Sequence, residues 1–152
     1  ALASRSPVMK SVREFAEKGG PVLGICNGFQ ILCESGLLPG ALLRNQGLKF
    51  IDDWVDLLVE NANPFFAKSL KAKTSLRLPV AHGEGRFFLP EEQIKEVEER
   101  GQVWLRYKRN INGSVRDIAG VSNVKKNVVG LMPHPERALE LWMGGADGGL
   151  FI

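Results

Sequence analysis

Cys26 is the residue of this sequence best placed to act as a nucleophile. It stands in the motif Gly24-Ile25-Cys26-Asn27-Gly28, after the short apolar run Pro21–Ile25 and before a segment with helical spacing. This order is typical of the G-x-S-x-G nucleophile elbow, with Cys in place of Ser and with glycines that leave room for a sharp turn. The turn also puts the thiol at a helix N-terminus, where the helix dipole and free N–H groups favour a thiolate and a developing oxyanion.

A cysteine nucleophile needs a base, and the chain has only two histidines to offer. His134 comes just after the apolar segment Val128–Met132, separated from it by Pro133, so we expect it at the carboxyl end of a strand, where sites form in open α/β sheets. Prolines on both sides fix its backbone, and Glu136 is close enough to orient the ring. We therefore predict that Cys26, His134 and Glu136 form a nucleophile, base and orienting acid.

The other histidine, His82, is the rival base. It lies in Ala81-His82-Gly83-Glu84-Gly85-Arg86-Phe87, which we expect to be a flexible surface loop that contacts substrate or a partner. Cys33 falls on the apolar face of the helix after Cys26, and we predict that it is a core residue. The chain has no second Cys pair that would complete a metal site with Cys26 and Cys33.

The elements that would position these residues follow from the periodicity. Ser6-Pro7 predicts the start of a helix with Val8, Val12, Phe15 and Ala16 on its apolar face. The first third therefore reads helix, buried strand, sharp turn, helix, which is typical of a parallel sheet with helices on its faces. Further expected elements are strands at 54–60, 76–81 (with Pro79 indicating an edge strand or a bulged strand), 102–107, 118–122 and 128–132, and helices at 90–100 and 136–143.

The composition restricts the classes of function. The 152 residues are 44% hydrophobic and 24% charged, which is typical of a folded domain, and we expect one domain over residues 1–152. No apolar run is long enough for a membrane span. Twenty Lys and Arg against 17 Asp and Glu do not indicate a nucleic-acid partner. Two cysteines do not make a disulfide framework, which favours a cytoplasmic location.

Several segments together resemble the class I, or triad-type, glutamine amidotransferases. They are GICNGFQIL, LLPGALLRNQGLKF, WVDLLVEN, AHGEGRF, NGSVRDIAGV and GLMPHPERALE, in order over nearly the whole chain. The resemblance implies a flavodoxin-like α/β domain with a mostly parallel sheet and helices on both faces. It also implies strands that normally precede Ala1, so we expect an N-terminally incomplete domain. It agrees with Cys26, His134 and Glu136 as the catalytic residues.

The resemblance further implies that glutamine is the substrate. Gln30 matches a position that contacts bound glutamine, the backbone N–H of Asn27 would hold the oxyanion beside Gly28, and the loop of residues 44–50 with Asn45 would close over the substrate. No cofactor or metal is expected in this chain. Similar members serve purine synthesis together with a large synthetase subunit, which uses ATP and Mg²⁺, and a small accessory subunit.

Two other functions remain open from the residues alone. A hydrolase of the same fold would cleave peptides or amides without a synthetase. A non-catalytic binding module would have an unreactive Cys26.

Overall fold

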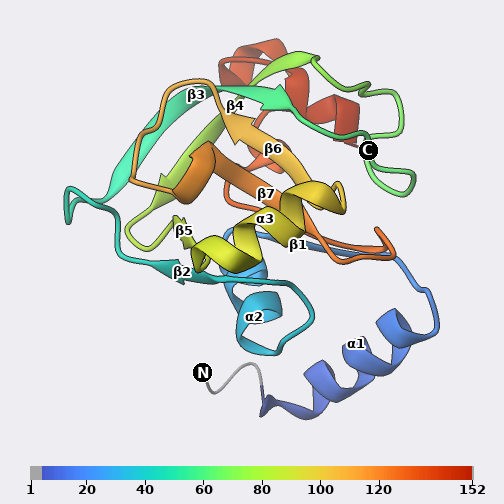
Figure 1. Ribbon diagram of the computed structural model, residues 1–152. Coiled ribbons are helices and arrows are strands. Elements are labelled where there is room, and N and C mark those ends of the chain that lie inside the picture. Colours follow the sequence, from blue (N-terminus) through green and yellow to red (C-terminus); the bar gives the residue numbers. More distant parts are fainter. Residues whose placement is uncertain (1–4, 152) are drawn as a thin grey trace.

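A six-stranded sheet forms the centre of the computed structural model, which describes residues 5–151 (Figure 1). Its strand order is β1-β8-β7-β6-β3-β4, and a separate antiparallel pair is formed by β2 and β5. The strands are β1 (Val22–Ile25), β2 (Ala41–Leu43), β3 (Ile51–Val59), β4 (Ser75–His82), β5 (Arg86–Phe88), β6 (Val103–Tyr107), β7 (Ile118–Ser122) and β8 (Val128–Leu131). The α-helices are α1 (Pro7–Glu17), α2 (Asn27–Glu34) and α3 (Glu91–Glu99).

The α/β class is confirmed, but the sheet is not mostly parallel. Only β1 and β8 run parallel among the described strands, and every other neighbouring pair is antiparallel. The connections explain the difference, because a parallel neighbour requires a crossover whereas a short turn produces an antiparallel one. Residues 123–127 join β7 to β8 by such a turn. Pro79 lies in β4 at the sheet edge, as predicted, where its missing N–H costs no ladder bond.

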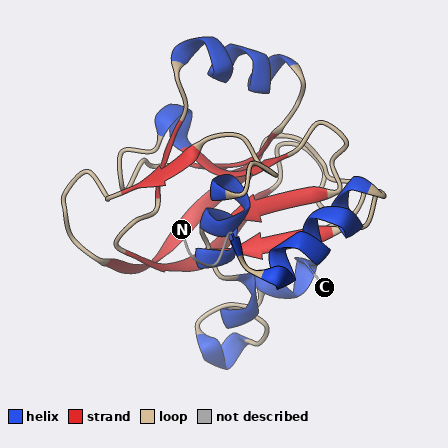
Figure 2. Cartoon of the chain, turned by 90° about the horizontal axis from the view of Figure 1, so that it is seen from below, coloured by secondary structure: helices blue, strands red, loops and turns tan. Residues whose placement is uncertain are grey.

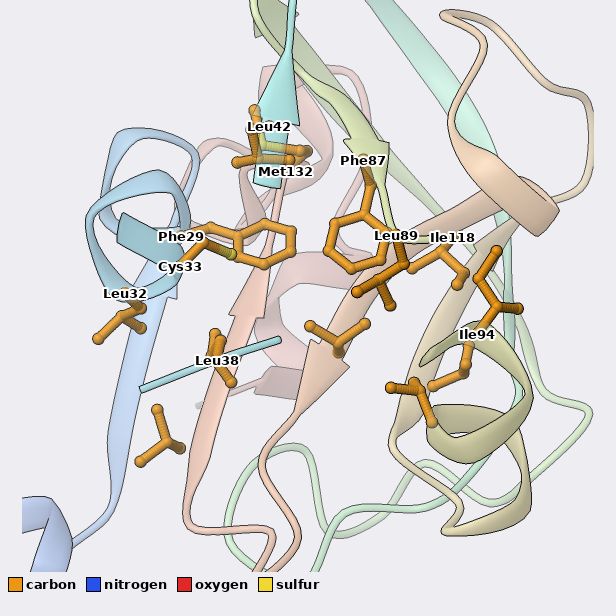
Figure 3. Close-up of a cluster of buried hydrophobic side chains, with 14 of the residues drawn as sticks. Phe29, Leu32, Cys33, Leu38, Leu42, Phe87, Leu89, Ile94, Ile118 and Met132 are labelled. Atoms are coloured by element: carbon orange, nitrogen blue, oxygen red, sulfur yellow. The ribbon is translucent and has the colours of Figure 1, made fainter. Parts of the chain in front are cut away.

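The two faces of the sheet are covered differently. Among the described residues, α-helices pack on one face only, so the expectation of helices on both faces is confirmed for that face and wrong for the other. One apolar cluster contains the buried side chains of α2 and α3 (Figure 3), together with Phe87 of β5. Phe29 and Phe87 stack there with ring centroids 5.8 Å apart. The other cluster packs strand residues against the loop residues Ala67 and Leu70 and against Phe151 near the C-terminus. Figure 2 shows the strands in the middle of the molecule, with helices outside them.

The first helix begins as predicted, but its apolar face is only partly buried. Ser6 caps α1 by accepting a hydrogen bond from the backbone N–H of Met9. Ala16 is buried, whereas Val8 and Phe15 are 69% and 52% exposed. The helix lies at the periphery of the molecule in Figure 1, and it contacts the apolar core through Ala16 and the partly buried Met9.

The prediction of one helix at 136–143 is wrong. The chain forms two short 3-10 helices, Pro135–Arg137 and Leu141–Met143, separated by non-helical backbone at Ala138 (φ −137°, ψ 49°) and Glu140 (φ −136°, ψ 151°). The Ala138 carbonyl accepts a hydrogen bond from Gly148 N–H at 2.8 Å, which takes the place of a helical bond. Only glycine fits at position 148, since a Cβ there would lie 1.8 Å from the Pro135 carbonyl oxygen.

Two further features of the strands could not be compared with, or predicted from, the residue pattern. The expectation that strands precede Ala1 lies outside the described residues. The β2–β5 pair was not predicted, because strands of three residues carry almost no periodic signal. Among the described residues, no helix is both long and apolar enough to cross a membrane.

Candidate active site

The parallel pairing of β1 with β8 brings Cys26 and the His134 segment to one edge of the sheet. Ile25 is the register partner of Leu131, so both strands end at the same level. The Cys26 N–H donates to the Leu131 carbonyl at 2.8 Å, and the His134 N–H donates to the Pro79 carbonyl at 2.8 Å. Residues more than a hundred positions apart are thereby fixed by backbone hydrogen bonds around one point.

Cys26 has the backbone of a nucleophile elbow. Its φ of 53° and ψ of −107° are unusual for a residue with a side chain, and it is the N-cap of α2. A Cβ at Gly24 would lie 2.7 Å from the backbone carbon of Gly28, so the turn requires glycine at position 24. A Cβ at Gly28 would meet nothing within 4 Å, so the predicted steric need for glycine there is wrong.

These two glycines allow a matched test of the elbow. We expect Gly24→Ala to destabilise the fold by about 1–3 kcal/mol, because the methyl group collides with backbone that cannot move independently. Gly28→Ala should leave stability unchanged or raise it by up to about 1 kcal/mol, because alanine favours the helix that contains it. Thermal unfolding of both variants checks this, and equal losses would contradict the geometry.

A cavity next to the elbow is lined by both the nucleophile Cys26 and the proposed base His134. Its volume is about 390 Å³, within the range of about 300–1,000 Å³ typical of small-molecule sites. The lining residues are Ile25, Cys26, Asn27, Gln30, Phe50, Ala81, His82, Gly83, Glu84, Met132, His134 and Arg137. A larger hollow of about 500 Å³ lies elsewhere, beside Trp54 and Lys108, and contains neither Cys nor His.

His134 is held by Glu136, as the sequence suggested. Its Nδ1 lies 2.5 Å from Oε1 of Glu136, and the ring is buried whereas the Glu136 side chain is 48% exposed. When Nδ1 carries the proton of this hydrogen bond, Nε2 presents a lone pair. That Nε2 is buried and has no hydrogen-bond partner among the described residues. It is therefore free to take a proton from a nucleophile.

The surroundings of Cys26 favour the neutral thiol, which differs from the thiolate expected at the helix N-terminus. Burial raises the pKa of the thiol, and the Glu136 carboxylate adds a smaller rise. The Asn27 backbone N–H and the Arg137 guanidinium lower the pKa without reversing the net effect. The Sγ also lies 3.8 Å from the Ala81 carbonyl oxygen, to which an S–H group can donate. Attack by this sulfur therefore requires a base.

The raised pKa predicts how alkylation of Cys26 depends on pH. Because only the thiolate reacts, we expect the rate of labelling by iodoacetamide to rise steadily from about pH 7 to pH 9. Mass spectrometry of the labelled peptides checks this, with Cys33 as the internal control, since burial raises the pKa of Cys33 to about 12. A rate that is already constant near neutral pH would instead indicate a resting thiolate.

The remaining predicted site residues fall into two groups. Asn27 and Gln30 line the cavity, whereas Gly28 and Asn45 do not. Asn45 is fully buried behind the cavity wall, where its side chain contacts His82. Cys33 is buried in the core, as predicted.

The structure corrects the predicted location of His82 and adds further residues to the cavity lining. The expectation that His82 lies in a surface loop is wrong, because it is the last residue of β4 and only 4% exposed. Burial lowers its pKa to about 4, which makes it a poor base. Glu84 and Arg137 line the cavity without having been assigned individual roles, whereas Phe50 belongs to the loop of residues 44–50 that was expected to close over the substrate. Arg137 directly follows the His-Pro-Glu motif, which was the available signal for it.

Comparisons with known proteins agree with this geometry. The sequence profile of the CobB/CobQ-like glutamine amidotransferase domain matches residues 1–146. A chain in the structure of PurLQS from Thermotoga maritima is 47% identical, with a TM-score of 0.89 over 98% of this chain and 66% of that chain. The sequence thus spans slightly less than two thirds of that relative.

Two more distant structures share the fold. A glutamine amidotransferase from Thermotoga maritima is 25% identical, with a TM-score of 0.56 over 85% of this chain and 46% of that chain. A Thermoplasma acidophilum protein assigned to GMP synthase is 14% identical, with a TM-score of 0.54 over 84% of this chain and 54% of that chain. The flavodoxin-like glutamine amidotransferase fold implied by the resemblance is confirmed.

Proposed function

The chain belongs to the CobB/CobQ-like glutamine amidotransferase family, and we propose that it is the glutaminase subunit of phosphoribosylformylglycinamidine synthase in purine synthesis. The observation that carries the proposal is that one cavity is lined both by Cys26 of the elbow and by His134, which is hydrogen-bonded to Glu136. The identity of 47% to a chain of PurLQS favours this member of the family.

In the proposed reaction, Nε2 of His134 takes the thiol proton while Sγ of Cys26 attacks the side-chain amide carbon of glutamine. The Asn27 N–H at the start of α2 stabilises the oxyanion that forms. The imidazolium then returns the proton to the leaving nitrogen, which departs as ammonia and leaves a γ-glutamyl thioester. Water, deprotonated by His134, hydrolyses the thioester and releases glutamate and the thiol.

The other charged groups of the cavity match the rest of the substrate. Glutamine carries an ammonium and a carboxylate at its α-carbon, and the cavity wall contains the Glu84 carboxylate and the Arg137 guanidinium. Gln30 adds a neutral group that can both donate and accept. We assign these residues to glutamine binding. Peptides lack the free α-groups, so this assignment favours a free amino acid over a peptide substrate.

The released ammonia must reach a second active site before it is protonated by water. We therefore propose that the chain works in a complex with a large synthetase subunit, which binds ATP and Mg²⁺, and a small accessory subunit. We also propose the cytoplasm as the compartment, because Cys26 must stay a free thiol to react.

The proposed function is tested by supplying glutamine or a glutamine-containing peptide and measuring release of ammonia. We expect release from free glutamine, with an increase when the synthetase subunit and its other substrates are added. Release from the peptide alone, without any response to the synthetase, would overturn the proposal in favour of an independent hydrolase.

A further inference from the structure

The side chain of Asn45 is held in one orientation by the backbone around it. Its Nδ2 donates to the His82 carbonyl at 2.8 Å and to the Lys49 carbonyl at 2.9 Å, which uses both N–H groups of the amide. Its Oδ1 accepts a hydrogen bond from the Gly85 N–H at 3.1 Å. The reversed amide would place N–H groups against the Gly85 N–H, so the oxygen position is fixed by its partners.

This orientation decides which nitrogen of His82 carries a proton. Nδ1 of His82 lies 3.2 Å from Oδ1 of Asn45. Because Oδ1 can only accept, Nδ1 donates, and burial lowers the pKa of the ring to about 4, so the imidazole has a single proton at neutral pH. Nε2 therefore presents a lone pair. The position of the ring also requires glycine at 85, where a Cβ would lie 2.3 Å from Nδ1.

This Nε2 has no protein partner in the described part of the chain, although it is buried. Buried polar atoms in folded proteins nearly always have a hydrogen-bond partner, so an unpaired acceptor in a cavity wall points to a donor that a ligand supplies. His82 lines the same cavity as Cys26 and His134. The proposed reaction uses Nε2 of His134 for the thiol proton and leaves Nε2 of His82 without a role.

We propose that His82 determines specificity for an amide, with its Nε2 accepting a hydrogen bond from the carboxamide NH₂ group of glutamine. The inference rests on the proposed function. A carboxamide nitrogen offers two N–H donors, whereas the carboxylate of glutamate offers only lone pairs, which the lone pair of Nε2 repels. Asn45 is then a positioning residue, which acts on the substrate through the tautomer of His82.

The first test requires no change at His82. In a Cys26→Ala protein, which binds glutamine without turnover, ¹⁵N NMR of the histidines should show His82 protonated at Nδ1 and bare at Nε2 at about pH 7. Adding glutamine should shift the Nε2 resonance, and adding glutamate should shift it much less. A proton on Nε2 in the free protein, or equal shifts with both ligands, would overturn the proposal.

The second test measures affinity by calorimetry in the same Cys26→Ala background. Replacing His82 with Phe should reduce the preference for glutamine over glutamate by about tenfold or more, since one hydrogen bond to the amide is lost. Asn45→Ala should reduce the preference in the same direction. Asn63→Ala is the matched control, because Asn63 is also a buried amide bound to backbone, at a carbonyl of Lys126 away from the cavity.

The outcomes separate the two proposals. An unchanged preference in His82→Phe, in a protein that still binds glutamine, would overturn the role of His82 and leave the glutaminase intact. A Cys26→Ala protein that binds neither amino acid would overturn the proposed function and, with it, the inference.

Discussion

Replacing Cys26 with Ala is expected to abolish glutamate release from glutamine, with a loss of about 10⁶-fold, because no other group can form the thioester. The structure offers no substitute nucleophile among its described cysteines, since Cys33 is buried in the core with its Sγ 3.6 Å from the Pro39 carbonyl oxygen. Synthesis driven by added ammonia should survive in the complex, because that reaction bypasses the glutaminase site.

Cys33→Ala is the matched control for this experiment. It removes the other thiol of the chain but leaves the cavity unchanged, so glutamate release should remain within about twofold of wild type, with a stability loss of at most about 2 kcal/mol. Glutamate is measured enzymatically, and ammonia-dependent product is measured in the same preparations. Glutamine hydrolysis that persists in Cys26→Ala would show that the elbow cysteine is not the nucleophile.

The sequence determines the elbow and its partner strand more clearly than any other part of the fold. Residues 21–25 and 128–132 are short apolar runs, with Cys26 directly after the first and His134 two positions after the second, and both form strands within a residue or two of their predicted bounds. Their signal is local, because a buried strand and a sharp turn are set by neighbouring residues. Their meeting at one edge of the sheet follows from the parallel pairing.

His82 shows what local patterns miss. Two nearby glycines indicated a flexible loop, yet Gly85 is needed to admit the buried imidazole, and Asn45, from a distant loop, holds that ring. A glycine that permits flexibility and a glycine that permits close packing look the same in a sequence. The prediction of a helix after Glu136 was wrong for a related reason. The Ala138 carbonyl accepts a hydrogen bond from the distant Gly148 N–H in place of the helical bond that the spacing indicated.

Replacing Glu136 with Gln is expected to lower kcat by about 10³–10⁴-fold with little change in KM. The carboxylate accepts a hydrogen bond from Nδ1 of His134 and stabilises the imidazolium that forms when the thiol proton arrives. Glutamine at this position can turn its NH₂ group toward Nδ1, which would put the ring proton on Nε2 and remove the lone pair that accepts the thiol proton. The defect therefore lies in proton transfer and not in substrate binding.

Stability distinguishes this role from a structural one. The Glu136 side chain is 48% exposed, so its hydrogen bond with His134 competes with water and should contribute less than about 1 kcal/mol to folding. We expect Glu136→Gln to unfold at nearly the wild-type temperature while its kcat collapses. Glu140→Gln is the matched control, because this nearby exposed carboxylate does not line the cavity. Should both variants keep full kcat, His134 must be oriented by its backbone and its flanking prolines alone.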